Sequence, residues 1–195
     1  MKYWLYSRHL TLAAGMCLLV PVLLLLASGR DLPVFLSPPF AAAVPLAPMS
    51  ALLVTAPAGL VIALRTTPEL VAVRSVRVIQ TVTLAAMASL PAAMCMLVQI
   101  IGWSDYGSAT ARNCLAFVGL TMMYSVFTRR NAALWSAGTG LVISTFGRAL
   151  DREPERWAWS IAAADNGMSW VWCAGLMIAG VTATFVGTNS SRAAR

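Results

Sequence analysis

The sequence predicts an all-α integral membrane protein with six transmembrane helices and both termini in the cytoplasm. Of its 195 residues, 59% are hydrophobic and 11% are charged, and the mean hydropathy is +0.75. Water-soluble domains do not have this composition. Six helices of about 20 residues would use most of the chain, so we expect one transmembrane domain over 1–195. The charge-free stretches that predict them are 9–29, 32–64, 78–104, 113–128, 131–147 and 166–191.

The distribution of charge predicts the orientation of these helices. If loops alternate from a cytoplasmic N-terminus, nine basic residues and one acidic residue fall inside, whereas five basic and six acidic residues fall outside. Cytoplasmic loops of membrane proteins carry such an excess of lysine and arginine. The basic residues form no patch, so we expect the lipid bilayer and no nucleic acid as a partner. The basic residues of the outer loops are Arg30, Arg112, Arg148, Arg152 and Arg156.

The first predicted helix covers 10–28. Lys2 and Arg8 precede it and small residues at 27–29 end it, which is also the pattern of a secretory signal peptide. The apolar run is longer than the core of a usual signal, so we interpret it as a membrane helix. Arg30 and Asp31, followed by Pro33, Pro38 and Pro39, then predict an outer turn.

The second predicted helix covers 41–64. Small residues recur in it at a spacing of four, and such a face lets helix backbones approach closely within a membrane. We therefore expect this face to contact another helix. Pro45, Pro48 and Pro57 either kink the helix for packing or mark a segment that bends during function. The small residues are Ala43, Ala47, Ala51, Thr55, Gly59 and Ala63.

Four further helices are expected over 79–102, 113–128, 131–148 and 168–188. The fifth helix of the chain carries Ser136, Gly140 and Ser144 at a spacing of four. We interpret these three residues as a packing face and not as the lining of a pathway. Tryptophans near both predicted membrane interfaces agree with the limits of the helices.

The segment 151–167, between the last two helices, is too short and too polar to span a membrane. Two interpretations stand for it: amphipathic pieces that dip into the outer interface, or an ordinary loop held by ion pairs. Two interpretations also stand for the start of the fourth helix. Arg112 would pair with Asp105 and Asn113 would cap the helix, or both residues would contact a cargo.

Residues that membrane enzymes use are missing from the predicted helices. The one histidine, His9, precedes the first helix, no acidic pair falls within a helix, and the chain has no glycine-rich phosphate loop. Cu(I) would find soft ligands in several methionines and cysteines, but Met94 and Cys95 point in different directions on a helix. We therefore expect no enzymatic activity, no cofactor and no metal site in this chain.

The loop after the second helix is built like a short amphipathic helix over 68–77. Glu69 suits its positive N-terminal end, and Leu70, Arg74 and Arg77 share one face opposite an apolar one. Such a helix either anchors in anionic lipid or docks a protein. Both interpretations fit the composition.

The order of these features resembles the membrane subunit of type-2 ABC exporters, which has six helices, both ends inside, a short helix after the second span and a polar excursion before the sixth. The stretches 112–120, 131–135 and 157–159 also resemble small actinobacterial membrane proteins regarded as ABC-transporter permease subunits. The resemblance covers about residues 69–180. The proline-rich stretch 33–48 departs from the family pattern.

This resemblance implies a plasma-membrane permease subunit that dimerises with itself or a similar subunit. We expect the dimer contact to use the first and fifth helices. Separately encoded ATPase subunits would bind the ATP and Mg²⁺, and export would be the direction of transport. Sparse polar groups within the helices favour a lipophilic or amphipathic cargo. The alternative is a non-transporting membrane scaffold or regulatory subunit. The implied sites are Glu69, Leu70, Arg74 and Arg77 for ATPase coupling, and Arg112, Asn113, Trp157 and Trp159 for an outer gate or cargo contact.

Overall fold

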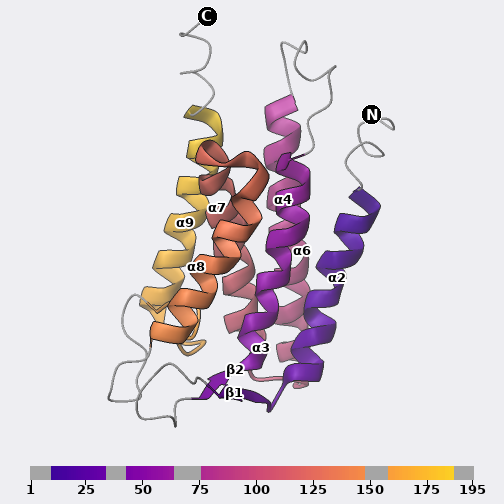
Figure 1. Cartoon of the computed structure of the whole chain (residues 1–195). Helices are drawn as coiled ribbons and strands as arrows, with labels where there is room; N and C mark the ends of the chain where they lie inside the picture. The colour runs from indigo at the N-terminus through magenta and orange to yellow at the C-terminus, as the bar shows by residue number, and fades with distance from the viewer. Residues whose placement is uncertain (1–9, 34–42, 64–75, 148–157, 187–195) are drawn as a thin grey trace, which may run out of the picture.

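The computed structural model of the chain describes residues 10–33, 43–63, 76–147 and 158–186. This part of the chain folds into a bundle of helices with one small sheet at one end (Figure 1). The predicted all-α class is confirmed, apart from that sheet. The elements are α2 (Leu10–Ala27), β1 (Asp31–Pro33), β2 (Ala43–Pro45), α3 (Leu46–Met49), η1 (Ser50–Val54), α4 (Thr55–Ala63), α6 (Val76–Ile100), α7 (Gly107–Phe127), η2 (Arg129–Asn131), α8 (Ala132–Phe146) and α9 (Gly167–Val186).

Three helices of the described part are long and apolar enough to cross a membrane. They are Leu46–Ala63, which joins α3, η1 and α4, then Val78–Ile100 within α6, and Gly167–Phe185 within α9. Two apolar helices are shorter, Thr11–Ala27 and Ala132–Phe146. Each of the six predicted helices therefore has a helix at its place in the structure.

The second helix begins later than the predicted residue 41. Ala43–Pro45 forms β2, which pairs antiparallel with β1 so that Leu32 faces Val44. Pro45 is extended, with φ −60° and ψ 125°, and the backbone N–H of Leu46 donates to the carbonyl oxygen of Arg30 at 3.0 Å. The helix therefore starts after the proline, and Ala43 lies in a strand.

The helix from Leu46 to Ala63 changes its winding between two of its prolines. Pro48 lies in the short α3, and the 3-10 helix η1 separates it from Pro57 in α4. Pro57 has no N–H to bond the carbonyl four residues before it, which weakens the α-helical pattern at this place. The hydroxyls of Ser50 and Thr55 donate to the carbonyl oxygens of Ala47 and Leu52, each at 2.7 Å. These bonds satisfy carbonyl groups along the altered stretch.

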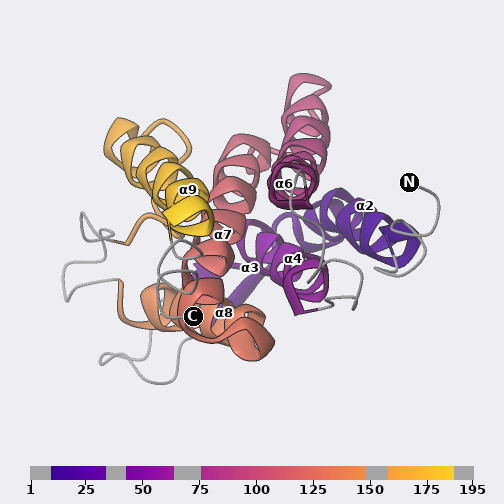
Figure 2. The ribbon, with the colours of Figure 1, turned by 90° about the horizontal axis from the view of Figure 1, so that it is seen from above.

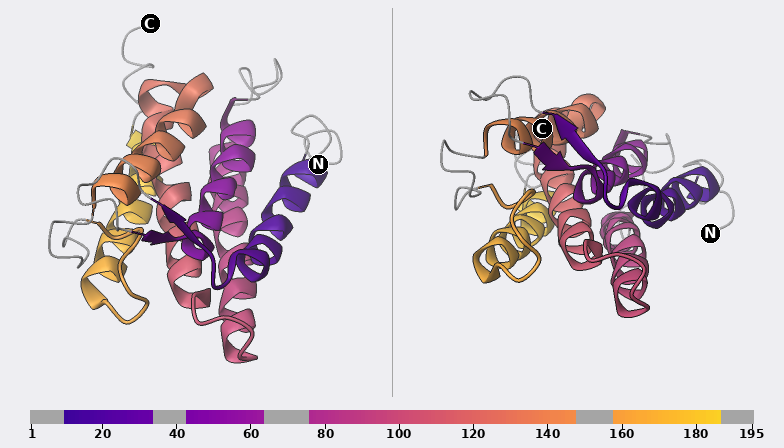
Figure 3. Two further views of the ribbon diagram at one scale, coloured as in Figure 1. Left: turned by 60° about the horizontal axis from the view of Figure 1, so that its bottom comes forward. Right: turned by 90° about the horizontal axis from the view of Figure 1, so that it is seen from below.

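Helix α7 is the centre of the bundle. Fifteen of its 21 residues are buried, and it packs against α6, α8, α9 and the α3–η1–α4 helix (Figure 2). Helix α2 lies at the edge, against α6 and α4, and the sheet covers one end of the bundle (Figure 3). The core between these helices is apolar and includes Leu24, Leu84 and Phe117.

The two predicted small-residue faces are confirmed as packing faces. Ala47, Ala51, Thr55 and Gly59 are buried, whereas Ala63 at the end of the row is exposed. A β-carbon at Gly59 would lie 2.5 Å from the β-carbon of Ala133 in α8, so the two helices touch at this glycine. On α8, the buried residues are Ala132, Ser136, Gly140 and Ser144.

Candidate functional site

Arg112 is a fully buried arginine in the second turn of α7, near the end of the bundle that holds the sheet, hereafter the sheet end. All five of its N–H donors meet acceptors within the described residues. Nη2 donates to the carbonyl oxygens of Trp159 (2.7 Å) and Ala162 (2.9 Å). Nη1 donates to the carbonyl oxygen of Ala163 (3.0 Å) and to the hydroxyl of Ser169. Nε faces Oδ1 of Asn113 at 3.4 Å.

The acceptors around Arg112 carry no formal charge. The expected ion pair with Asp105 is wrong, because the described structure directs the guanidinium toward residues 159–163 instead. Helix α7 begins at Gly107, six residues before the predicted start, which places Arg112 inside the helix and Asp105 ahead of it. Burial of an arginine among neutral groups is tolerated only where every donor is bonded, as it is here.

Asn113 joins three segments of the chain. Its Nδ2 donates to the carbonyl oxygens of Ser160 at 2.7 Å and Pro48 at 3.3 Å. The predicted role as a helix cap is therefore wrong, since Asn113 is the seventh residue of α7 and the residue before the helix is Tyr106. Asn113 instead ties α7 to α3 and to the segment before α9.

Residues 158–163, hereafter the inserted segment, form turns that lie within the bundle. They form no helix, whereas the charged part of the predicted 151–167 segment, over 151–157, lies outside the described residues, so its amphipathic and ion-paired interpretations both stay predictions. Ala158, Trp159, Ser160, Ile161 and Ala162 are buried, and only Ala163 is exposed. The segment is thus an internal part of the fold, although it lies in the connection between α8 and α9.

Side-chain contacts hold the inserted segment in place, in addition to the hydrogen bonds that its carbonyl groups accept. The ring of Trp159 packs on Phe117 with centroids 5.1 Å apart and a tilt of 58°. The hydroxyls of Ser160 and Ser144 lie 3.0 Å apart, and Ile161 packs in a small cluster with Met49. Trp159 therefore belongs to the core, whereas its predicted companion Trp157 lies outside the described residues.

The hydroxyl and thiol groups near this site take part in hydrogen bonds or lie buried and free among the described residues. The Ser144 hydroxyl is shared among Ser160, the sulfur of Met49 and the carbonyl oxygen of Gly140, with no base beside it. All four cysteines are buried and free. Within the described ranges, no group of three or more His, Cys, Asp or Glu side chains is placed to hold a metal ion.

The predicted ATPase-coupling residues fall mostly outside the described residues. Glu69, Leu70 and Arg74 lie in the stretch between Ala63 and Val76. Arg77 is the second residue of α6, which begins three residues before the predicted 79. The backbone at Arg77 is therefore continuous with the long helix.

Ser169 is the site residue that the sequence did not indicate. Its hydroxyl accepts from Arg112 and donates to the carbonyl oxygen of Asn166 at 2.7 Å, while Asn166 Oδ1 accepts from the Ser169 N–H at 3.3 Å. Asn166 and Ser169 have the spacing of a helix cap and the third helical residue, so the sequence could have predicted the start of α9. The backbone carbonyl acceptors could not have been predicted in this way, because every residue has a carbonyl group.

Comparison of the chain with protein-family models, with curated proteins and with solved structures gives no match.

Proposed function

We propose that the chain is a multi-pass membrane protein with six spans and serves as the membrane subunit of an ATP-driven ABC transporter. One observation carries the orientation: the start of α2, the end of α4, the start of α6, the turn between α7 and α8 and the end of α9 all lie at the end of the bundle opposite the sheet end (Figure 1). The arginine-rich segments that begin or end at these helix ends would therefore share one side of the membrane. The positive-inside rule makes that side cytoplasmic and the sheet end extracytoplasmic.

An apolar outer surface supports insertion of the whole bundle in a membrane. Large hydrophobic side chains are exposed on α2, α6, α8 and α9, and lipid would cover them. Exposed Trp103 lies at the sheet end and exposed Trp135 near the opposite end, as expected for aromatic residues at two interfaces. Representative exposed residues are Leu26, Val82, Leu97, Leu134, Val142, Val171 and Ile178.

The buried state of Arg112 strengthens the charge argument. Arg112 counted among the basic residues of the outer loops, yet its charge lies inside the fold. The outer loops then hold four basic and six acidic residues against nine basic residues and one acidic residue inside. The asymmetry that orients the chain is therefore larger than the sequence count suggested.

The ATPase contact is proposed at the cytoplasmic connection between α4 and α6. Leu70 would enter a groove of the ATPase, and Arg74 and Arg77 would pair with acidic residues at its rim, with Glu69 at the start of the helix. Truncation of such an anchor commonly costs about 1 kcal/mol or more of binding. Two ATPase subunits would bind the ATP and Mg²⁺ and hydrolyse the ATP.

A transport pathway would form between two copies of the membrane subunit. Within the described residues, every buried side-chain nitrogen or oxygen except Thr128 Oγ1 has a hydrogen-bond partner, so one bundle offers few polar groups to a cargo. Helix α7 is enclosed by its neighbours and leaves the outer helices α2, α6, α8 and α9 for contact with a second copy. Among these we place the dimer contact on α2 and α8, the first and fifth helices, as expected from the sequence.

Because nearly all buried polar atoms of the described residues already have hydrogen-bond partners, a second candidate function is also favoured: a non-transporting membrane scaffold or regulatory subunit. Co-expression with the neighbouring genes, purification in detergent and mass spectrometry separate the two. A stably bound ATP-binding-cassette protein supports the permease, and its absence supports the scaffold.

Variants of the cytoplasmic connection test the coupling directly. Leu70→Asp and Arg74→Glu should release the ATPase or uncouple its hydrolysis from cargo, with insertion of the helices unchanged. Arg130→Glu is the matched control, because Arg130 is exposed at the same end of the bundle but outside the proposed contact. Full ATPase association and coupled activity in both variants would identify the connection as a lipid anchor.

A further inference from the structure

The buried charge of Arg112 is compensated by weak acceptors. Its five donors meet three backbone carbonyls, one hydroxyl and one amide oxygen, and none of these groups is anionic. Hydrogen bonds from a guanidinium to a carboxylate or phosphate are roughly twice as strong as those between neutral groups. An oxyanion that reached Arg112 would therefore bind it more strongly than the present carbonyl acceptors do.

The carbonyl acceptors come from the part of the site that is least tied into regular structure. Three of the five acceptors, on Trp159, Ala162 and Ala163, belong to the inserted segment, which has neither helix nor strand. The other two, Asn113 and Ser169, are fixed on α7 and α9. Withdrawal of the inserted segment would leave a preformed set of donors: the guanidinium and Nδ2 of Asn113, which now donates to Ser160.

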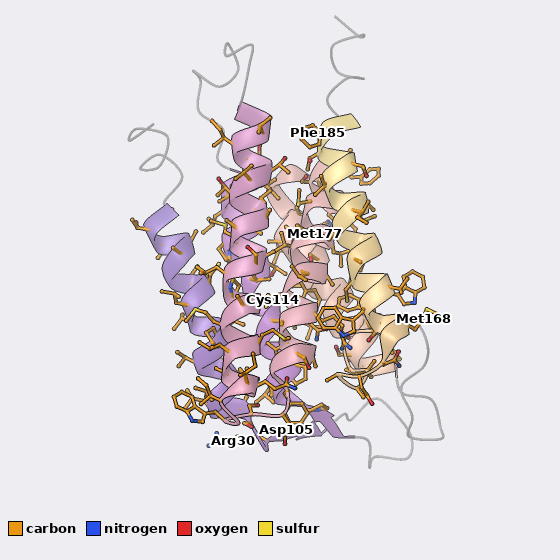
Figure 4. All side chains as sticks on the ribbon, turned by 180° about the vertical axis from the view of Figure 1, so that it is seen from behind. Arg30, Asp105, Cys114, Met168, Met177 and Phe185 are labelled. Carbon is orange, nitrogen blue, oxygen red and sulfur yellow. The ribbon has the colours of Figure 1, made fainter. Side chains whose placement is uncertain are left out.

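In the proposed membrane placement, Arg112 lies close to the outer interface, within reach of lipid headgroups. Arg112 is the sixth residue of α7, about 8 Å along the helix from its start at the sheet end. The first turns of α9 beside it expose Met168, Val171 and Trp172, which form an apolar surface for an acyl chain. Figure 4 shows Met168 on the lower part of α9, toward the end of the bundle where Asp105 lies, with Phe185 near the opposite end of that helix.

We propose that the inserted segment is a displaceable plug over an oxyanion site formed by Arg112 and Asn113, and that its ligand is the phosphate or similar headgroup of an anionic amphiphile. The headgroup would take the place of the carbonyls of residues 159–163, and the acyl chain would lie along α9. This inference rests on the proposed membrane placement of the bundle. It goes beyond that placement by naming the chemistry of the cargo, and it does not depend on an ATPase.

Cysteine accessibility in the purified full chain tests the plug. Ser160→Cys is nearly isosteric at a fully buried position, and Ala163→Cys is the matched control at the exposed end of the same segment. The native chain, with its four buried cysteines, gives the background. Each chain is placed in phosphatidylcholine nanodiscs and labelled with a water-soluble maleimide, alone and with dodecyl phosphate, dodecyl maltoside or inorganic phosphate.

Dodecyl phosphate should raise the labelling rate of Ser160→Cys about tenfold, which corresponds to about 1.4 kcal/mol. Dodecyl maltoside, which has the same chain but no charge, should leave the rate unchanged, and Ala163→Cys should label rapidly throughout. In the Arg112→Gln background, labelling at 160 should be fast and should not respond to dodecyl phosphate. Arg112→Lys, which keeps the charge with fewer donors, should respond only partly.

An unchanged rate for Ser160→Cys with both phosphates, while Ala163→Cys labels normally, would overturn the oxyanion site. An equal rise with inorganic phosphate would support the site and overturn the amphiphile as its ligand. If Arg112→Gln does not fold, the comparison of dodecyl phosphate with dodecyl maltoside in the native Arg112 background still tests whether an anionic headgroup displaces the segment. Because no ATPase is present, a negative result here is separate from a failure of ATPase co-purification.

Discussion

The backbone of Gly119 in α7 lies directly against Gly180 in α9. A β-carbon at Gly119 would lie 2.6 Å from the carbonyl oxygen of Leu176 and 2.7 Å from the α-carbon of Met177. A β-carbon at Gly180 would collide with the backbone of Gly119 itself. Since α9 is otherwise largely exposed and packs chiefly on α7, this glycine pair fixes the attachment of the last helix.

Gly180→Ala should destabilise the bundle by about 1–3 kcal/mol, the usual cost of added volume in a packed contact. Backbone atoms cannot move aside as the end of a flexible side chain can, so the helices must separate. Gly175→Ala is the control, because nothing lies within 4 Å of a β-carbon at that position of the same helix. Unfolding in detergent with increasing SDS, followed by circular dichroism, gives both values. Equal losses from the two variants would contradict the contact.

Arg112→Gln should lower the free energy of unfolding more than Arg112→Lys does. Both variants should lower it more than Arg30→Gln does. The glutamine amide has two donors and lysine three, against the five that now bond to the site, and each buried group left unpaired costs about 1–3 kcal/mol. Arg30 is exposed at the sheet end, so its side chain should matter little. The same SDS titration measures all three. A tolerated Arg112→Gln would show that the inserted segment holds its place without the guanidinium.

Impermeant maleimide added to whole cells should label Asp105→Cys and Ala163→Cys but not Arg130→Cys. The first two positions are exposed at the sheet end and Arg130 is exposed at the opposite end, which we propose to be the cytoplasmic side. Gly107, although close to Asp105, is unsuitable because a side chain there would meet Gln99 and the backbone of Cys95. Permeabilised cells should label all three. Labelling of Arg130→Cys in intact cells would reverse the topology.

Disulfide crosslinks between copies should form at Leu19→Cys on α2 and Val142→Cys on α8. Both positions are about half exposed, at 50% and 55%, on the helices proposed to form the dimer contact. Leu90→Cys on α6 is a control of similar exposure, 48%, on a helix outside that contact. Oxidation in native membranes followed by non-reducing electrophoresis gives the yields. A higher yield at position 90 than at 19 and 142 would place the dimer contact elsewhere.

The helices were predictable from the sequence because apolar length and small-residue spacing act locally. The four-residue spacing of small residues predicted that Gly59, Ser136 and Gly140 pack against other helices, and all three are buried in the structure. The start of α7 was not predictable by the same reasoning. Arg112 appeared to end an apolar stretch, whereas the structure accommodates its charge inside the helix.

The role of Arg112 depends on contacts that no residue pattern encodes. Its partners are carbonyl groups of residues 159–163, about fifty positions along the chain, and any amino acid supplies a carbonyl group. Asp105 was the nearest opposite charge in the sequence and therefore the natural candidate. The fold provides enough neutral acceptors from one inserted segment that no carboxylate is needed.

The 3-10 stretch η1 changes how far the second helix reaches. A chain of 18 residues wound entirely as α-helix would be about 27 Å long, slightly short of a hydrocarbon layer of about 30 Å. The five residues of η1 rise about 2.0 Å each instead of 1.5 Å, which lengthens Leu46–Ala63 to about 29–30 Å. If this helix spans the membrane as we propose, the tighter winding beside Pro57 brings its length close to the thickness of the hydrocarbon layer, and the bilayer need not thin around it.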